Sequence, residues 1–204
     1  MREISATTYA EWRATAEITA ADHFGDKVLL LADGTYLKLF RVKRLFTSAR
    51  LFPYWRRFCR NAQGLSERGI LTVQMIDVIR IPSMDRTAVH YRPLPGKNLR
   101  EIGPLDAPLV LALGKFFKTL HDKGVYLRSI HLGNVILTPE GELGLIDIAD
   151  MKIHSNSLSH WRRVRNFHHV ARYEEDKRAI ARHLDQFLIS FDYKLQSKLK
   201  QMFA

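Results

Sequence analysis

The sequence predicts an α+β fold in two lobes: a small antiparallel sheet with one helix, followed by a mainly helical part. Short alternating apolar segments separated by turns fill residues 1–91. A segment rich in proline and glycine follows at 91–99 and is typical of a hinge. Helical periodicity prevails after it, interrupted by one short hairpin. We therefore expect an N-terminal lobe at 1–91 and a C-terminal lobe at 92–204, together one domain.

Turn chemistry and periodicity predict the elements of the first lobe. Alternating apolar residues between turns predict five strands, at 17–20, 27–32, 35–40, 71–81 and 86–91. Asp33-Gly34 is a typical tight hairpin turn between two of them. A short amphipathic helix is expected at 7–16. After Pro53, helical spacing of apolar residues predicts a second helix over 54–68, which Gly69 ends.

The second lobe is predicted to consist of three helices around a hairpin. Helical patterns occupy 107–123, 159–172 and 174–203, and Gly124 ends the first of them. Between the first and the second lie two apolar strands, Val135–Thr138 and Leu143–Ile146, joined by a Pro-Glu-Gly-Glu turn.

Composition is that of a compact globular protein. At 204 residues the chain can bury a substantial core, and 46% hydrophobic with 26% charged residues are values typical of globular proteins. The single Cys59 rules out an internal disulfide and suits a reducing compartment. The N-terminal segment lacks the apolar core of a signal peptide, and the apolar runs are shorter than a membrane span. We expect a cytoplasmic protein.

The net charge of +11 is concentrated in two stretches that contain no acidic residue. The first, 38–60, holds Lys38, Arg41, Lys43, Arg44, Arg50, Arg56, Arg57 and Arg60, and the second, 151–173, holds Lys152, Arg162, Arg163, Arg165 and Arg172. Such stretches attract polyanions and anionic membrane surfaces. A solvated basic face without a partner is the plain alternative. Aromatic residues among the arginines also permit nucleic-acid binding, but no nucleic-acid motif accompanies them.

An asparagine and an aspartate stand at the two ends of the hairpin in the second lobe. Asn134 directly precedes its first strand, and Asp147 directly follows its second strand. A hairpin of this length brings the two side by side, as one amide oxygen and one carboxylate. Mg²⁺ accepts such ligands beside the phosphates of a substrate. The alternative is that both are ordinary turn residues.

The segment 126–150 resembles the catalytic and metal-binding loops of the protein-kinase-like superfamily. The spacing from Ser129 to Asn134 matches the catalytic-loop pattern H-R-D-x-x-x-x-N, and His131-Leu132-Gly133-Asn134 is similar to the H-x-G-N of aminoglycoside and choline kinases. Asp147-Ile148-Ala149 stands where the D-F-G triplet would be. Lys38, on an apolar strand after the hairpin turn, matches the lysine that holds the nucleotide phosphates in this superfamily.

Within the superfamily the chain most resembles small bacterial lipopolysaccharide-core kinases and the related "toluene tolerance" kinase-like proteins. The segments that carry this likeness are LKLFRVKR (37–44), LRSIHLGN (127–134), GLIDIADM (144–151) and RVRNFHHVARY (163–173). The resemblance implies a two-lobed kinase-like fold and an ATP-dependent phosphotransferase with an alcohol group as acceptor. The acceptor would be an anionic glycolipid or sugar phosphate, met in the cytoplasm or peripherally at the inner membrane.

The resemblance also assigns roles to individual residues. Lys38 and Tyr91 would bind ATP, while Asn134 and Asp147 would hold Mg²⁺. Ser129 replaces the catalytic aspartate, and the loss of a general base typically costs about 10²–10⁴-fold in rate. Asp150 and His131 are the neighbours that could substitute for it. Each has a plain alternative, since Asp150 resembles a loop or cap residue and His131 a hydrogen-bonded structural histidine.

Other parts of the kinase pattern are missing. The phosphate-covering G-x-G-x-x-G loop is replaced by residues 21–26, and the helix at 54–68 has no internal glutamate to pair with Lys38. A strand lysine is also commonly a solvated side chain. A pseudokinase that regulates a partner is therefore the alternative function, favoured by Ser129, whereas the Asn134 and Asp147 pair favours the enzyme. A basic nucleic-acid-binding protein is the weaker alternative.

Overall fold

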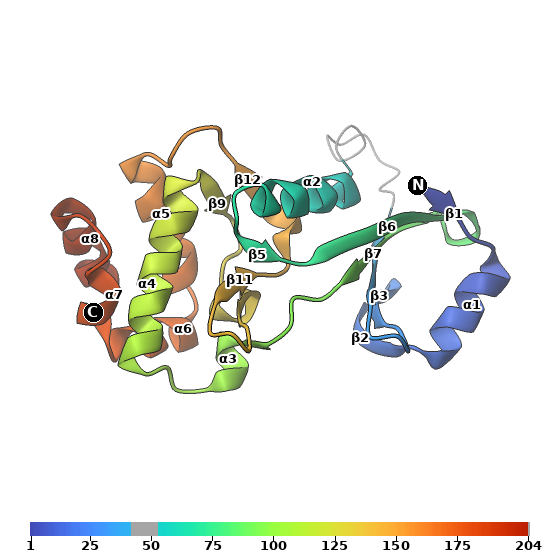
Figure 1. Ribbon diagram of the computed structural model, residues 1–204, viewed down its shortest axis with the longest axis horizontal. Coiled ribbons are helices and arrows are strands. Elements are labelled where there is room, and N and C mark those ends of the chain that lie inside the picture. The colour runs from blue at the N-terminus through green and yellow to red at the C-terminus, as the bar shows by residue number, and fades with distance from the viewer. Residues whose placement is uncertain (42–52, 204) are drawn as a thin grey trace. The chain divides into compact units, whose positions relative to one another are not determined.

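The computed structural model describes residues 1–41 and 53–203, and it confirms the α+β class (Figure 1). The chain divides into two compact units. The first comprises 1–63 and 72–93, and the second comprises 64–71 and 94–204. None of the helices in the described part of the chain has the length and apolar character needed to cross a bilayer.

The first unit is built on a six-stranded sheet. Its strands, in spatial order, are β1 (Arg2–Glu3), β6 (Gln74–Ile81), β7 (Arg86–Arg92), β4 (Tyr36–Arg41), β3 (Gly25–Leu30) and β2 (Glu17–Asp22). All neighbours are antiparallel except β1, which runs parallel to β6. The sequence does not predict β1, because two residues show no periodicity. Helix α1 (Ala6–Thr15) begins at Ser5, whose hydroxyl accepts a hydrogen bond from the Thr8 amide at 3.0 Å.

The β3–β4 hairpin determines which face of the sheet each β4 side chain occupies. Gly34 adopts a φ of 79° in its turn, and Asp33 accepts hydrogen bonds from the Thr35 amide and hydroxyl. Leu37 and Leu39 point into the buried cluster beneath the sheet. Lys38 alternates to the opposite face, where its ammonium lies 5.4 Å from the ring centre of Phe58 on α2 (Tyr54–Ser66).

The second unit contains two small sheets. The strands of the first sheet, in spatial order, are β5 (Leu71–Thr72), β11 (Leu143–Leu145), β10 (Val135–Leu137) and β8 (Lys97–Asn98). Of the two residues of β5, only Leu71 belongs to the second unit. The second pairs β9 (Val125–Leu127) with β12 (Met151–Ile153). Strand β8 lies inside the segment predicted as a hinge, and its Asn98 pairs with Ile136 of β10.

Six helices complete the second unit: α3 (Leu99–Ile102), α4 (Ala107–Asp122), α5 (His160–Ala171), α6 (Glu174–Ala181), α7 (Leu184–Leu188) and α8 (Tyr193–Phe203). The prediction of one helix over 174–203 is wrong, because the chain leaves helical geometry twice. His183 has φ −133° and ψ 41°. Asp192 then caps a new helix by accepting a hydrogen bond from the Leu195 amide at 2.9 Å.

An aromatic cluster forms the centre of the second unit. Phe117 of α4, Phe167 of α5 and Phe187 of α7 meet with ring centres 5.3 to 6.1 Å apart. Gly114 allows this close approach, since a Cβ there would lie 2.5 Å from the Phe187 carbonyl oxygen. The cluster therefore holds α4, α5 and α7 together as one support for the loops that follow.

One buried histidine links this support to β9. The Nε2 of His121 lies 3.0 Å from the Asn166 amide oxygen, and the Asn166 amide nitrogen donates to the carbonyl of Leu127. His121 Nδ1 has no hydrogen-bond partner among the described residues, so a neutral ring with its proton on Nε2 fits the site. Burial lowers the pKa of His121 to about 4. The end of β9 is thus fixed by a neutral polar chain.

The low pKa of His121 predicts a pH-dependent stability. Its folded-state pKa of about 4 lies below the ordinary 6.5, so the unfolded chain binds the proton more tightly. The neutral His121 ring therefore contributes roughly 3 kcal/mol to the free energy of unfolding. This contribution is complete above the unfolded-state pKa of 6.5 and is lost as the pH falls from 6.5 to about 4. Urea unfolding across this range should show the decline in the wild type and a shallower one in His121→Gln. The variant His168→Gln, at an exposed position, should keep the wild-type dependence of the free energy of unfolding on pH. The same pH dependence in the wild type and in both variants would contradict the role of His121.

Candidate functional site

Two strand pairs bring the two loops of the predicted site together. In the β9–β12 pair, Leu127 lies opposite Met151, and the Arg128 amide donates to the Asp150 carbonyl at 3.3 Å. In the β10–β11 hairpin, the Ile146 amide donates to the Asn134 carbonyl at 3.0 Å. The loop 128–134 and the loop 146–150 are therefore joined at both of their ends.

Ser129 and Asp150 meet across these loops. The Ser129 hydroxyl lies 3.4 Å from Oδ2 of Asp150, a long hydrogen bond between an exposed residue and a partly buried one. A carboxylate thus lies beside the residue whose position corresponds to the catalytic aspartate of the kinase pattern. A carboxylate can accept the proton of a hydroxyl, which a serine at neutral pH cannot.

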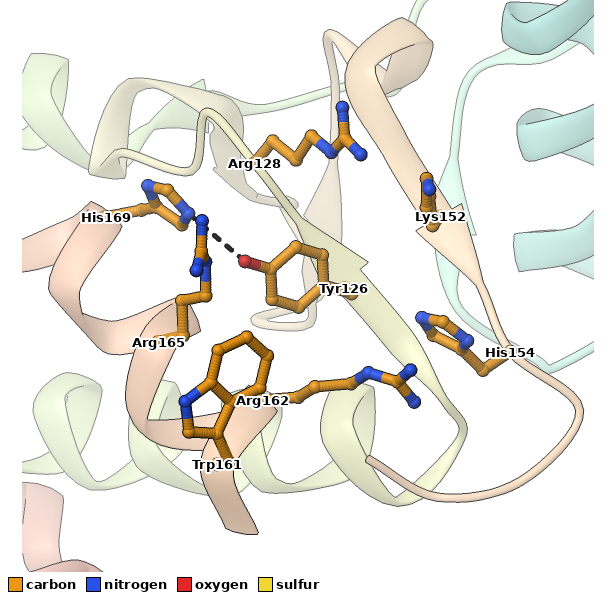
Figure 2. Close-up of a pocket in the computed structure, with 8 residues that line it drawn as sticks. All are labelled: Tyr126, Arg128, Lys152, His154, Trp161, Arg162, Arg165 and His169. Atoms are coloured by element: carbon orange, nitrogen blue, oxygen red, sulfur yellow. Dashed lines mark hydrogen bonds between the residues drawn. The ribbon is translucent and has the colours of Figure 1, made fainter. Parts of the chain in front are cut away.

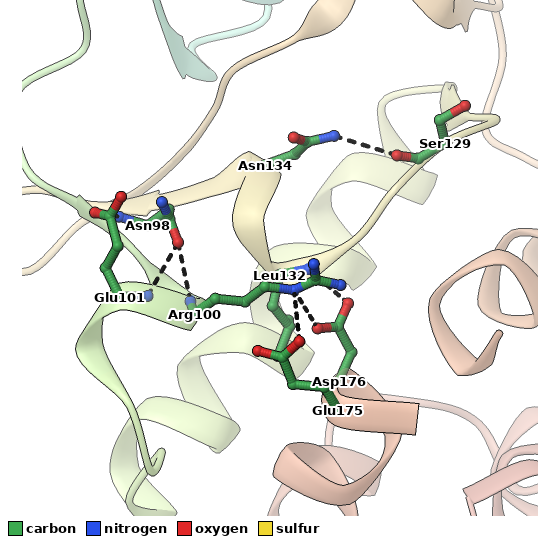
Figure 3. A network of polar contacts seen from close by, with 8 residues as sticks. All are labelled: Asn98, Arg100, Glu101, Ser129, Leu132, Asn134, Glu175 and Asp176. Atoms are coloured by element: carbon green, nitrogen blue, oxygen red, sulfur yellow. Dashed lines mark hydrogen bonds and ion pairs between the residues drawn. The ribbon is translucent and has the colours of Figure 1, made fainter. Parts of the chain in front are cut away.

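Asn134 and Asp147 lie at the open end of the hairpin. Asn134 is 8% exposed, and its amide nitrogen donates to the Ser129 carbonyl at 3.2 Å (Figure 3). This bond orients the side chain so that the amide oxygen points the other way, where it can act as a ligand. Asp147 is exposed and has a left-handed backbone with φ 52°, a conformation that Asp tolerates better than most residues.

These two residues form an incomplete ligand set for a metal. No group of three His, Cys, Asp or Glu side chains suited to a metal occurs within residues 1–41 and 53–203. Mg²⁺ is commonly held by one or two protein oxygens, with water and substrate phosphates completing its shell. One amide oxygen and one exposed carboxylate therefore fit Mg²⁺ bound with a nucleotide better than a stand-alone metal site.

His131 has the surroundings of a structural residue. Its ring meets the edge of Tyr173 with ring centres 5.3 Å apart. Its buried Nδ1 has no hydrogen-bond partner in the described part of the chain. Burial, and after it the charge of Arg100, lowers the pKa of His131. These contacts indicate a packed ring, but among the described residues they do not supply the hydrogen bond that the structural alternative predicts.

A buried carboxylate that the sequence does not single out fixes the loop 128–134. Asp176 is 0% exposed, and its two oxygens accept from the Leu132 amide and from Arg100 Nε, each at 2.8 Å (Figure 3). Arg100 also lies 5.1 Å over the ring of Tyr173. The run of three acids at 174–176 predicts a helix N-terminus. Which of the three faces inward depends on packing across the unit.

The two residues predicted to bind the nucleotide belong to the first unit. Lys38 lies opposite Val89 in the β4–β7 pair, beside Phe58. Tyr91 on β7 is buried and stacks on Tyr36 with ring centres 5.8 Å apart. That Lys38 and Tyr91 share one nucleotide site with the loops of the second unit stays a prediction.

The second basic stretch contains both exposed cations and a cation that is paired within the fold. Residues 42–52, with Lys43, Arg44 and Arg50, lie outside the described residues. In the second stretch, Arg163 pairs with Asp122 at 2.7 Å and donates to the Leu158 carbonyl, so it is a structural cation. Arg162 and Arg165 on the same helix are exposed.

Comparison with models of known protein families finds no match to this chain, and comparison with curated proteins finds none either. The resemblance to kinase-like proteins therefore rests on residues of this sequence alone, in the two loops and in the segments 37–44 and 163–173.

The network around Asp176 predicts that replacing Asp176 destabilises the fold much more than replacing its neighbour Glu175. Asp176→Ala leaves Arg100 and the Leu132 amide without their buried partner and should lower the free energy of unfolding by about 3 kcal/mol or more. Glu175 lies 3.7 Å from the same arginine, but its side chain is 67% exposed. Glu175→Ala should cost less than about 1 kcal/mol. Urea denaturation compares the two; similar losses would contradict the anchoring role of Asp176.

Proposed function

We propose that this chain is an ATP-dependent phosphotransferase with a protein-kinase-like fold, acting on an alcohol group of an anionic glycolipid such as a lipopolysaccharide-core sugar. The observation that carries the proposal is the 3.4 Å contact between Ser129 and Asp150. It supplies a carboxylate where the resemblance lacks one, beside the Asn134 side chain that is held on the Ser129 carbonyl. The lobes of the proposed fold are 1–91 and 92–204.

The proposed reaction needs little covalent chemistry from the protein. The acceptor hydroxyl attacks the γ-phosphorus of ATP, the bond from that phosphorus to the bridging oxygen breaks, and ADP leaves. The hydroxyl proton passes to Asp150. Asn134 and Asp147 would hold Mg²⁺, which when bound neutralises charge on the phosphates. Lys38 would hold the phosphates, and Tyr91 would lie near the adenine.

The charge distribution supports an anionic acceptor at a membrane surface. Arg162 and Arg165 are exposed on α5, and Arg56 and Arg57 on α2 lie over Trp55 and Tyr54. Each Lys or Arg near an anionic bilayer contributes about 1 kcal/mol, and salt screens this attraction. The proposed location is the cytoplasm, and these cations support peripheral contact at the inner membrane.

A pseudokinase is the second candidate function. It is favoured by Ser129, which cannot act as a base, and by the packing of His131 against Tyr173. Such a protein would bind MgATP, or only keep the kinase shape, and would regulate a partner without transferring phosphate. Binding and transfer therefore have to be measured separately.

MgATP should stabilise the folded chain. A ligand at a hundredfold excess over its dissociation constant adds about 2.7 kcal/mol, which corresponds to about 5–10 °C in melting temperature for a chain of this size. Asp147→Asn should abolish the Mg²⁺-dependent part of the shift because it removes the ligand charge. Glu140→Gln, an exposed acid on the far turn of the same hairpin, should leave it unchanged. No shift at millimolar MgATP would exclude the enzyme.

Removal of the Asp150 carboxylate should impair transfer without impairing nucleotide binding. Asp150→Asn should lower kcat by about 10²–10⁴-fold, the usual contribution of a general base, while Ser129→Ala should lower it less. The assay is ³²P transfer from ATP to purified lipopolysaccharide core, with and without Mg²⁺. The MgATP thermal shift serves as the control for folding and binding. Equal losses in both variants would contradict Asp150 as the base, and absence of transfer by the wild type would favour the pseudokinase.

A further inference from the structure

A cationic cavity of about 540 Å³ lies within the second unit (Figure 2). Its walls are the strands β9 and β12, each with the residue that follows it, and the helix α5. Four of its lining residues carry permanent positive charge: Arg128, Lys152, Arg162 and Arg165. Its size falls within the range of roughly 300–1,000 Å³ that is usual for small-molecule sites.

The positive charge in this cavity has no acidic counterpart among the described residues. No acidic residue is among those that line it. None of its four cations forms an ion pair within residues 1–41 and 53–203. Arg100 and Arg163, elsewhere in the same unit, both pair with carboxylates. Like charges held around one cavity repel each other and concentrate anions there.

Two histidines add neutral ring nitrogens to the cavity lining, His169 on α5 and His154 after β12. The Tyr126 hydroxyl lies 3.2 Å from His169 Nε2, and Arg172 approaches His169 Nδ1 at 2.7 Å. Burial, and then the charges of Arg172 and Arg165, lowers the pKa of His169. Burial, and then Arg162 and Lys152, lowers that of His154. Both rings are therefore held near a positive potential that a bound anion would relieve.

The cavity lies near the proposed reaction centre, because residues that line it are close in sequence to Ser129 and Asp150. Arg128 directly precedes Ser129, and Lys152 follows Asp150 by two residues, a span of at most about 7 Å. Tyr126 and Lys152 are paired across β9 and β12. A ligand bound on this strand pair is therefore held close to the loops that carry Ser129 and Asp150.

The chemistry of the walls points to a phosphorylated sugar. Arginine offers planar pairs of donors that match phosphate oxygens. Trp161 is 64% exposed, lies under Arg165 at 5.2 Å, and presents a flat apolar face next to the cations. A sugar ring can pack its C–H face on such a surface. A nucleic acid would require a groove with several stacking aromatic residues, and Tyr126, the other aromatic residue of the lining besides the histidines, is buried.

We infer that this cavity binds a phosphate monoester already present on the acceptor sugar, so that the chain selects a phosphorylated sugar for further phosphorylation. The identity of the ligand as an acceptor rests on the proposed function, whereas the anion site itself does not. The shared chemistry is a sugar phosphate, either free or displayed on a glycolipid headgroup.

Isothermal titration calorimetry of the full chain with glucose 6-phosphate tests the site, with glucose and inorganic phosphate as comparison ligands. The wild type should bind glucose 6-phosphate more tightly than either. Arg165→Gln should weaken this binding by about ten- to a hundredfold, as expected for a lost charged hydrogen bond. Arg178→Gln is the matched control, since its side chain is 78% exposed on α6 outside the cavity. Lys152→Gln on β12 provides a second test if Arg165→Gln fails to fold.

Four outcomes would overturn the inference: no binding of glucose 6-phosphate, equal weakening by Arg165→Gln and Arg178→Gln, equal binding of inorganic phosphate, or displacement of the sugar phosphate by single-stranded RNA at lower concentration. Phosphatidylcholine vesicles that contain lipid A distinguish the two sources of the sugar phosphate, a glycolipid headgroup and a free sugar phosphate. Retention on these vesicles that Arg165→Gln reduces supports a glycolipid, and binding of free glucose 6-phosphate alone supports a soluble sugar phosphate.

The MgATP thermal shift separates this inference from the proposed function. Arg165→Gln should leave that shift unchanged, because its residue lies outside the proposed nucleotide site. If the wild-type chain shows no MgATP shift but binds the sugar phosphate, the result refutes the enzyme and supports the anion site. A retained MgATP shift without sugar-phosphate binding would refute the anion site and leave the enzyme standing.

Discussion

The geometry of the candidate site depends on one buried carboxylate. The loop 128–134 lacks extended regular structure, yet it carries Ser129 and Asn134. Asp176 accepts a hydrogen bond from the backbone of this loop and balances its own charge with Arg100. An unpaired carboxylate at this depth would be strongly unfavourable, so the loop, α3 and α6 are held in one arrangement. The position of the Ser129 and Asn134 side chains thus depends on residues of α3 and α6.

Charges in the second unit fall into two classes with different consequences. Arg100 and Arg163 are paired with carboxylates and fix elements to one another. The cations of the cavity on β9, β12 and α5 have no acidic residue among their neighbours in its lining. The interior uses a neutral chain instead, from His121 through Asn166 to Leu127, because burial disfavours a charged ring. Part of the positive charge of the described residues is therefore gathered on one local surface that lacks acidic residues in its lining.

Most helices and strands follow from local sequence. The Asp33-Gly34 turn, the helix that begins after Pro53 and the helix that ends near Gly124 are found close to where turn chemistry and apolar spacing predict them. Local signals fail where an element is very short, as for β1, or where a cap interrupts an apolar pattern, as at Asp192. The hairpin with Asn134 and Asp147 at its ends is equally local, since its register follows from the length of its turn.

The sequence by itself therefore determined the α+β class, most elements and the pair of residues at the hairpin ends. Only the tertiary structure decided that Asp150 meets Ser129, that Asp176 is buried while Glu175 is exposed, and that Arg163 is a structural cation. Helical and strand periods report contacts over a few residues. The bonds of Asp176 join residues 44 and 76 positions apart. Such contacts depend on how the helices of the unit pack, which no local pattern encodes.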